Sequence, residues 1–383
     1  MIELAQILDA DTSGRLTLAK ETGRLSPVVA VLAPLVFDKE VSLAESVALA
    51  LVDELTEASS AALRALDRDF RSPAFLAKWP TCSTLSDAEW ARRESLSGDA
   101  SLAALTIACL GRAGRKRERA CHFLGRRPEA LCFALLVLRL NDPFESTRHV
   151  AREALQHWLT PARIVSVSRY SPLVESASAW QWAGGSRVDS AFFALLDQNE
   201  GVLLAQTRHK DPRVRLSAYR RLGHVRADSG SIEEVLRPAI TDASPRIRAW
   251  ARITTNAKST PKDVRQRLAR LMLSNRSPRT REMALRLLRS ADDIADILMD
   301  VAFDANAGVR FVARASAQKL NITLPSRKEA IEALAQGTQL VGALALLSDY
   351  GGQSDAALVR PFTEHSNRRV RVEARRTLSL LLA

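Results

Sequence analysis

The chain has 383 residues, of which 46% are hydrophobic and 26% charged, so it can bury a sizeable core and is neither disordered nor fibrous. Ala, Leu and Arg are abundant, and because all three are good helix formers the composition argues against a β-rich fold. The formal net charge of +12 makes nucleic acid and acidic proteins the two classes of partner to consider.

Residues 1–110 carry more acidic than basic side chains and are predicted to be an irregular helical region. Apolar residues recur with helical spacing over 26–36, 43–55 and 100–110. We expect this region to cap the end of the array described below or to form a separate lobe. The first residues lack the basic flank and apolar stretch of a secretory signal, and no apolar run reaches membrane-spanning length, so a cytoplasmic protein without membrane contact is expected.

Residues 111–127 are rich in arginine and begin with Gly111 and Gly114. Glycines interrupt helices and like charges repel, so this stretch is interpreted as a solvated basic linker. A phosphate-binding loop is the alternative interpretation.

The remainder of the chain, residues 128–383, contains a repeated motif. An arginine marker preceded by an apolar residue or threonine and followed three positions later by alanine recurs, with intervals of 33 residues between the clearest copies. The markers are Arg148, Arg215, Arg248, Arg281, Arg310 and Arg371. The first and last intervals are about twice as long, so each should hide one degenerate copy. Residues 340–343 fit the later interval, and a segment within 161–188 must fill the earlier one.

The spacing within a copy corresponds to one face of an α-helix. The residue before the marker, the alanine at +3 and often a leucine at +7 are four apart, so they stack into a core seam. Helix starts are marked too: Asp211, Ser244 and Ser277 precede a proline as N-caps, and Asn306 and Asn367 take that place where the proline is missing. A partner helix with its own start signals lies between copies, so each unit is a helix pair that must stack on its neighbours.

These residues resemble the HEAT repeat, particularly the short bacterial kind. The resemblance rests on an aspartate six positions before the marker, together with the alanine after it. It implies an all-α fold, an α-solenoid of about eight stacked helical hairpins over residues 128–383, with an irregular helical N-terminal region. In that family the Asp and Arg of successive repeats tend to form a hydrogen-bonded ladder along the concave surface. The implied ladder residues are Asp142, Arg148, Arg215, Asp242, Arg248, Arg281, Asp304, Arg310 and Arg371.

The sequence departs from this pattern at three aspartate positions. Asn275 replaces the acid in one copy, and His209 and His365 replace it in two others. We expect the ladder to be broken there.

A second set of arginines stands four residues after a marker. These are Arg152, Arg252, Arg314 and Arg375. Together with the markers they could form a basic stripe that neutralises phosphates or acidic side chains. In the structural interpretation, the aspartate holds the marker and only the second arginine faces solvent. This interpretation is favoured for the markers. For the second set, both a structural role and a binding role remain possible interpretations.

Residues 161–188 break the repeat and contain Trp180 and Trp182 beside a glycine pair. Tryptophans next to a flexible segment could contact a peptide or a base. The alternative is that they fill the core of a poorly formed repeat.

Catalytic and cofactor motifs are missing: there is no dinucleotide-binding or phosphate-binding glycine loop, zinc-protease motif or nucleophile elbow. The cysteines Cys82, Cys109, Cys121 and Cys132 form no C-x-x-C pair, so reduced structural thiols and no metal site are expected. The sequence therefore favours a non-catalytic protein without cofactor.

Two functions follow from these observations. The leading hypothesis is a scaffold that binds a protein partner on its concave surface. The alternative is a nucleic-acid-binding protein with a basic groove, similar to the HEAT-like alkylpurine DNA glycosylases, with Trp158, Trp180 and Trp250 as candidates by residue type only. The resemblance also extends to HEAT-like proteins associated with phycobilin lyases and to accessory or immunity-like partners, although no cysteine-centred chromophore chemistry can be argued here.

Overall fold

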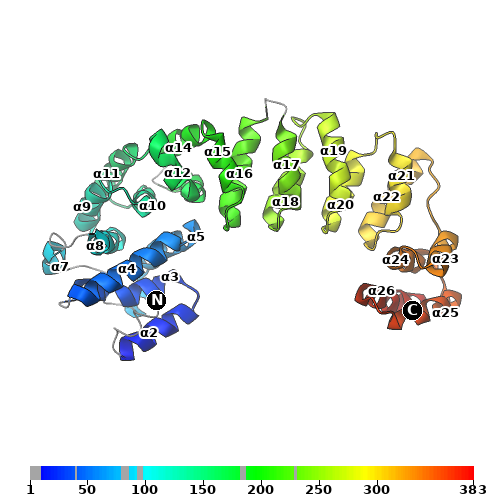
Figure 1. Cartoon of the computed structure of the whole chain (residues 1–383), viewed down its shortest axis with the longest axis horizontal. Coiled ribbons are helices and arrows are strands. Elements are labelled where there is room, and N and C mark those ends of the chain that lie inside the picture. Colours follow the sequence, from blue (N-terminus) through cyan, green and yellow to red (C-terminus); the bar gives the residue numbers. More distant parts are fainter. Residues whose placement is uncertain (1–9, 39–40, 79–85, 93–97, 182–186, 228–230) are drawn as a thin grey trace. The chain divides into compact units, whose positions relative to one another are not determined.

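The computed structural model describes residues 10–38, 41–78, 86–92, 98–181, 187–227 and 231–383. Every regular element in these ranges is a helix (Figure 1), which confirms the predicted all-α fold. The chain divides into two compact units, residues 1–222 and residues 223–383. No helix in the described ranges is long and apolar enough to cross a membrane.

The N-terminal unit contains short and long helices in irregular succession, and the division between the units falls within the last of them. In chain order they are α2 (Ala10–Glu21), α3 (Leu25–Leu32), η1 (Ala33–Phe37), α4 (Val41–Glu57), α5 (Ser60–Asp69), α6 (Pro73–Lys78), α7 (Asp87–Arg92), α8 (Gly98–Leu110), α9 (Gly114–Leu124), α10 (Ala130–Arg139), α11 (Glu145–Gln156), α12 (Pro161–Val167), η4 (Ser168–Tyr170), α13 (Ser171–Ala177), α14 (Val188–Asp197), α15 (Glu200–Gln206) and α16 (Pro212–Val225).

Two core helices form the centre of the N-terminal unit. Residues 102–110 of α8 and residues 131–139 of α10 are buried on every side of the helix. A helix that is apolar around its whole circumference belongs in a core. α4, α9 and η1 pack against α8, while α5, α11 and α13 contact α10. The apolar segments predicted at 26–36, 43–55 and 100–110 are therefore all helical, and the last of them supplies a core helix.

The C-terminal unit consists of helix pairs that follow one another along the chain. Its elements are α17 (Ile232–Thr241), α18 (Pro245–Thr255), α19 (Lys262–Leu273), α20 (Pro278–Leu287), α21 (Ile294–Val301), α22 (Ala307–Leu320), α23 (Arg327–Gln336), α24 (Leu340–Tyr350), η5 (Gln353–Asp355), α25 (Ala356–Val359), η6 (Arg360–Glu364) and α26 (Arg368–Leu381).

The two helices of a pair pack against each other, and several helices also pack against the next pair. α17 contacts α18, α19 contacts α20, α21 contacts α22 and α23 contacts α24, while α20 also packs on α22 and α24 on α26. In the green-to-red half of Figure 1 these pairs succeed one another as the layers of a solenoid. The predicted α-solenoid of stacked helical hairpins is therefore confirmed.

The predicted core seam lies inside the molecule. All six residues that precede a marker are at most 5% exposed, and all six alanines at +3 are at most 3% exposed. The predicted N-caps are present at three helices, because the side chains of Asp211, Asn306 and Asn367 accept hydrogen bonds from backbone N–H groups of the first turn. Ser244 and Ser277 also stand at N-cap positions, but their side chains make no capping bond.

The stretch expected to be a linker, 111–127, contains the helix α9, which packs between α8 and α11. Within it, Arg117 stands at a marker position: Ala120 at +3 and Leu124 at +7 are fully buried, as in the other copies. Of the glycines that suggested a loop, Gly111 lies in the turn before this helix and Gly114 is its first residue. The repeat pattern thus extends further toward the N-terminus than the sequence suggested.

The two degenerate copies can also be located, and the earlier one begins at the end of the expected segment, 161–188, and extends beyond it. In the earlier interval the helix α14 begins at Val188 and buries Val188, Phe192 and Leu196, so an aspartate, Asp189, takes the marker position and a phenylalanine replaces the small alanine. In the later interval α24 is the equivalent helix, and Gly342 near its start lies so close to the turn after α21 that a Cβ atom would meet the Phe303 carbonyl oxygen at 2.1 Å.

Candidate functional site

Each marker arginine holds the loop that precedes its own helix. Its Nη1 atom donates a hydrogen bond to the backbone carbonyl six positions earlier, over 2.7–2.9 Å. The pairs of donor and carbonyl are Arg148–Asp142, Arg215–His209, Arg248–Asp242, Arg281–Asn275, Arg310–Asp304 and Arg371–His365. Arg117 does the same to the carbonyl of Gly111 at 2.9 Å. We call this contact the arginine clasp.

The side chain at the sixth position before the marker closes the same loop from the other side. Asp142, Asp242 and Asp304 each accept a hydrogen bond from the backbone N–H two residues later, at 2.7–3.0 Å. The amide oxygen of Asn275 accepts the equivalent bond at 3.0 Å, and the Nδ1 atoms of His209 and His365 accept it at 3.0 and 3.1 Å. The loop geometry therefore continues through the three positions where a break was expected, because an amide oxygen or a neutral imidazole nitrogen is an acceptor too.

Carboxylates also join one repeat to the next. Arg281 binds Asp304 of the following loop with two parallel bonds of 2.6 and 2.8 Å. Arg310, which is 1% exposed, binds Asp349 of α24 in the same way at 2.8 and 2.7 Å. Burial by itself would raise the pKa of Asp349, but hydrogen bonds from Arg310 and Arg314 lower it below its ordinary value. Asp349 of α24 thus binds the marker of the preceding repeat, Arg310, as Asp304 binds Arg281.

In the N-terminal unit the corresponding ion pairs are fully buried. Asp142 binds Arg117 at 2.7 and 3.0 Å and Arg139 at 3.4 Å, and neither the Asp142 nor the Arg139 side chain is exposed to solvent. Arg139 also binds Asp67 of α5. Burial lowers the pKa of Arg139 to about 10, although the charge of Asp142 acts in the opposite direction. Burial would raise the pKa of Asp142, but the bond from Arg117 and the charge of Arg139 bring it below its ordinary value.

The second set of arginines is divided between the two units. Arg152 is half-buried on α11 of the N-terminal unit, whereas Arg252, Arg314 and Arg375 lie on α18, α22 and α26 of the C-terminal unit. Arg314 is bound to Asp349 at 2.6 Å and lies 5.7 Å from the Tyr350 ring centroid, so its charge is already partnered. The described residues offer neither Arg252 nor Arg375 a carboxylate, so both charges face solvent or a partner.

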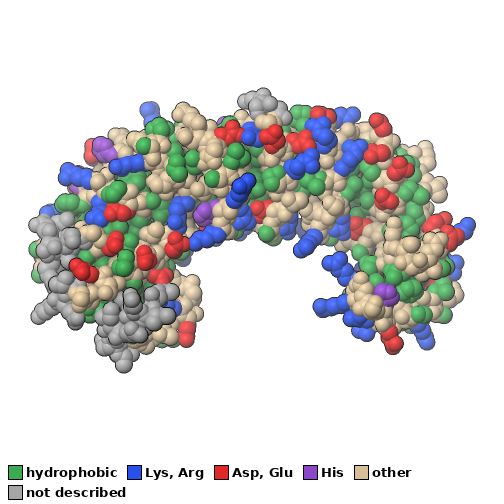
Figure 2. All heavy atoms as spheres, in the orientation of Figure 1, with side chains coloured by type: hydrophobic (Ala, Val, Ile, Leu, Met, Phe, Trp, Pro, Cys, Tyr) green, Lys and Arg blue, Asp and Glu red, His purple; other side chains and the backbone are tan. Residues whose placement is uncertain are grey.

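Large apolar side chains are exposed on the helices that carry these arginines. Phe311 and Val372, each directly after a marker, are 65% and 59% exposed, and Ile253, one turn further along the same helix face of α18, is 65% exposed. Because the markers and the seam face inward, the position after the marker faces outward. We call Ile253, Phe311 and Val372, with Arg252 and Arg375, the exposed second-helix face. Figure 2 shows Lys and Arg side chains gathered around α26 in the same unit.

The tryptophans are separated by the fold. Trp180 is half-buried and borders a pocket of the N-terminal unit, while Trp182 lies outside the described residues. Trp158 is completely buried beside Phe133, so it cannot contact a base. Trp250 is half-buried and its ring lies 3.2 Å from the place where a Cβ atom of Gly223 would stand.

The described residues bring no three His, Cys, Asp or Glu side chains together around a common point where a metal ion could sit. Cys109, Cys121 and Cys132 are buried and unbonded, and burial raises the pKa of the Cys132 thiol to about 12, which keeps it protonated. Cys82 lies outside the described residues.

Sequence reasoning missed several of these groups. Arg117 could have been found from the alanine three positions after it and from its distance of 31 residues to the next marker. Asp349 had no signal, because it stands at the end of a helix rather than in the loop. Phe311 and Val372 could have been found from their shared place after the marker, where a solvated helix normally carries a polar residue.

Comparisons with known proteins give distant structural likenesses only. No protein-family model matches the sequence. No curated protein matches it either. Among solved structures, two of the karyopherin Kap121p have TM-scores of 0.30 and 0.29 and 12% identity, and one of Kap121p bound to the extreme C-terminus of the protein phosphatase Cdc14p has 0.30 and 13%. In each case 99% of this chain is covered, and the chain spans 48% of the length of the solved structure.

Proposed function

We propose that this chain is a non-catalytic helical-repeat scaffold that binds a protein partner through the exposed second-helix face of its C-terminal unit. The observation that carries the proposal is the presence of large exposed apolar side chains, Phe311 and Val372, at equivalent places in two repeats, those of α22 and α26. Water contact at such residues is unfavourable, and equivalent positions of a repeat array form one extended surface.

The chemistry of this face suits a protein better than a nucleic acid. Aromatic and aliphatic residues next to arginines are typical of the energetically dominant part of protein interfaces. A phosphate backbone would instead require a regular series of unpartnered basic residues. Of the four arginines expected to form such a series, Arg314 is bound to Asp349 and Arg152 belongs to the other unit.

The test compares the full chain with two variants in quantitative affinity capture and crosslinking from an extract of the source organism. One carries Phe311→Ser with Val372→Ser, and the control carries Leu358→Ser, which removes an equally large apolar side chain, 44% exposed, from α25. We expect the double variant to lose its protein partner by about 30-fold or more, because buried interface anchors contribute about 2 kcal/mol or more. The control should retain it.

Two outcomes would contradict the proposal. One is recovery of DNA or RNA without protein. The other is equal capture by the double variant and by the full chain. A labelled DNA duplex, titrated in a salt series, provides the complementary measurement: tight binding that falls steeply with salt would favour the nucleic-acid alternative.

A further inference from the structure

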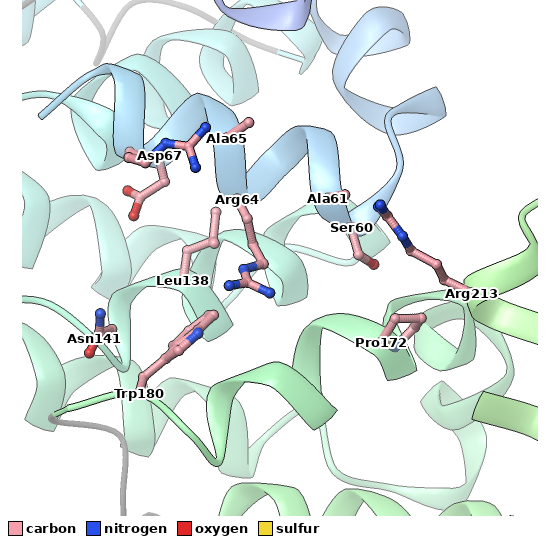
Figure 3. A pocket seen from close by; sticks show the side chains of 11 residues that line it. Ser60, Ala61, Arg64, Ala65, Asp67, Leu138, Asn141, Pro172, Trp180 and Arg213 are labelled. Atoms are coloured by element: carbon pink, nitrogen blue, oxygen red, sulfur yellow. The ribbon is translucent and has the colours of Figure 1, made fainter. Parts of the chain in front are cut away.

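A pocket of about 540 Å³ lies within the N-terminal unit, far along the sequence from the exposed second-helix face. Figure 3 shows α5 on one side of it, Leu138 and Asn141 at the end of α10, and Pro172, Trp180 and Arg213 on the other sides. Its volume is in the range of pockets that bind small molecules or single anchoring side chains of a partner.

The lining of the pocket carries an excess of positive charge. It contains Arg64, Arg68 and Arg213 but only one carboxylate, Asp67. That carboxylate is already bound to the buried Arg139 and, at 3.2 Å, to Arg71. Arg64 and Arg213 are exposed, and the described residues give neither of them a carboxylate partner. Two arginine charges at the pocket are therefore without a counterion.

Trp180 supplies the apolar part of the pocket. The Arg64 guanidinium lies 5.7 Å from the centroid of its ring, and in Figure 3 the Arg64 side chain points from α5 toward Trp180. An arginine over an indole face keeps its hydrogen-bond donors available around its edge, so it can bind a carboxylate while it stacks. The pocket thus offers an anion site directly beside an aromatic surface.

We propose that this pocket binds an acidic segment of a protein partner, with acidic side chains bound by Arg64 and by Arg213 and an aromatic side chain packed on Trp180. A short acidic segment fits better than a polyanion, because the described lining holds two arginines without a carboxylate partner, whereas an extended phosphate backbone is bound by a longer series of basic side chains. The inference shares with the proposed function only the claim that the partner is a protein, and it uses a different surface.

The test is a display selection of random 12-residue peptides on the immobilised full chain. Parallel selections use the pocket variant Arg64→Gln with Arg213→Gln, which removes the charge and keeps a polar side chain, and the face variant Phe311→Ser with Val372→Ser. We expect peptides that combine Asp or Glu with an aromatic residue to be enriched on the full chain and on the face variant, and to be lost on the pocket variant.

Peptides lost only on the face variant would support the proposed function and overturn the pocket assignment. No enrichment, or enrichment without an excess of acidic residues, would overturn it as well. Peptides lost only on the pocket variant would support the pocket as the binding site for the acidic segment, whether or not the exposed second-helix face also binds a partner.

The most enriched peptide, labelled with a fluorophore, then gives affinities by anisotropy. Arg64→Gln and Trp180→Ala should each weaken binding at least tenfold, whereas Arg126→Gln, an exposed arginine of the same unit outside the pocket, should leave it unchanged. If a 20-nucleotide DNA strand displaces this peptide at a lower concentration than the unlabelled peptide does, the occupant is nucleic acid and the proposal fails.

Discussion

The two units use the same arginine clasp in different surroundings. In the C-terminal unit Arg281 and Asp304 remain 17% and 11% exposed, so water still reaches the pair. In the N-terminal unit Asp142 and Arg139 are entirely buried, and Arg117 is only 6% exposed. Burial thus differs between these pairs: water reaches the Arg281–Asp304 link between repeats, whereas Asp142 belongs to a buried charge cluster.

This difference matters for stability because a buried charge depends on its partner. Moving a charge out of water is costly, and a buried pair compensates that cost only while both members are present. A half-exposed pair contributes less and also loses less when it is broken. We therefore expect the N-terminal unit to be far more sensitive to single substitutions at ladder positions.

The largest predicted effect is that of Asp142→Ala. It leaves Arg139 and Arg117 without their shared carboxylate, which should lower the free energy of unfolding of the N-terminal unit by about 3–5 kcal/mol. Asp304→Ala, the matched change in the C-terminal unit, should cost only about 1–2 kcal/mol, because water can solvate Arg281. Hydrogen exchange of each unit in the full chain measures both values. Equal losses of unfolding free energy for the two variants would show that burial of the ion pair does not determine the effect of the substitution.

Two glycines, one in each unit, test how closely the helices around them are packed. Gly342→Ala should destabilise the C-terminal unit by about 3 kcal/mol, because its Cβ atom would stand 2.1 Å from the Phe303 carbonyl oxygen. Gly201→Ala in α15 of the N-terminal unit meets nothing within 4 Å and should stabilise that unit by about 0.5–1 kcal/mol. Thermal unfolding of the two variants and of the full chain shows whether each substitution lowers or raises the melting temperature. A neutral Gly342→Ala would disprove the close approach of α24 to the backbone at Phe303.

The smallest predicted effect is a pH dependence at His209. Burial lowers the pKa of His209 and the charge of Arg169 lowers it further, while Asp211 acts in the opposite direction. Because the pKa is lower in the folded than in the unfolded chain, the stability contributed by neutral His209 is present above the unfolded value and is lost as the pH falls through the folded one. Protonation would also remove the Nδ1 acceptor from the loop.

His209→Asn tests this directly, since Asn275 shows that asparagine closes the same loop elsewhere in the chain. The variant should match the full chain at pH 8 and melt at a higher temperature than the full chain at pH 5. Melting curves of the pair at both pH values measure the difference. Parallel pH dependences of the two proteins would contradict the assignment.

Much of the repeat could be predicted from the sequence, because it depends on local rules. The seam at −1 and +3 and the caps at Asp211, Asn306 and Asn367 follow from helical spacing and from backbone groups within one turn. The copy at Arg117 was overlooked because its flanking glycines and charges suggested a loop. Its burial depends on Asp142, 25 residues away, which no local rule includes.

The candidate sites were less predictable because they depend on contacts between distant segments. Arg64 and Trp180 come together across more than one hundred residues, so neither signals the other in the sequence. Arg314 had no visible partner until the fold brought it to Asp349 at the end of α24. The closure of the loop within a repeat does not require the acid, because the side chains of His209, Asn275 and His365 accept the same backbone hydrogen bond.

The central claim is a division of labour between two arginines on α18 and on α26: the marker, Arg248 or Arg371, holds the loop, and the arginine four residues later, Arg252 or Arg375, is available for binding. Arg248 and Arg252 on α18 test it within one helix, through the opening free energy of α17–α19 measured by hydrogen exchange in the full chain. We predict that Arg248→Ala lowers it by about 1–3 kcal/mol, because two carbonyl hydrogen bonds of 2.7 Å are lost, and that Arg252→Ala changes it by less than about 0.5 kcal/mol. Equal effects, or a larger effect of Arg252→Ala, would contradict the account.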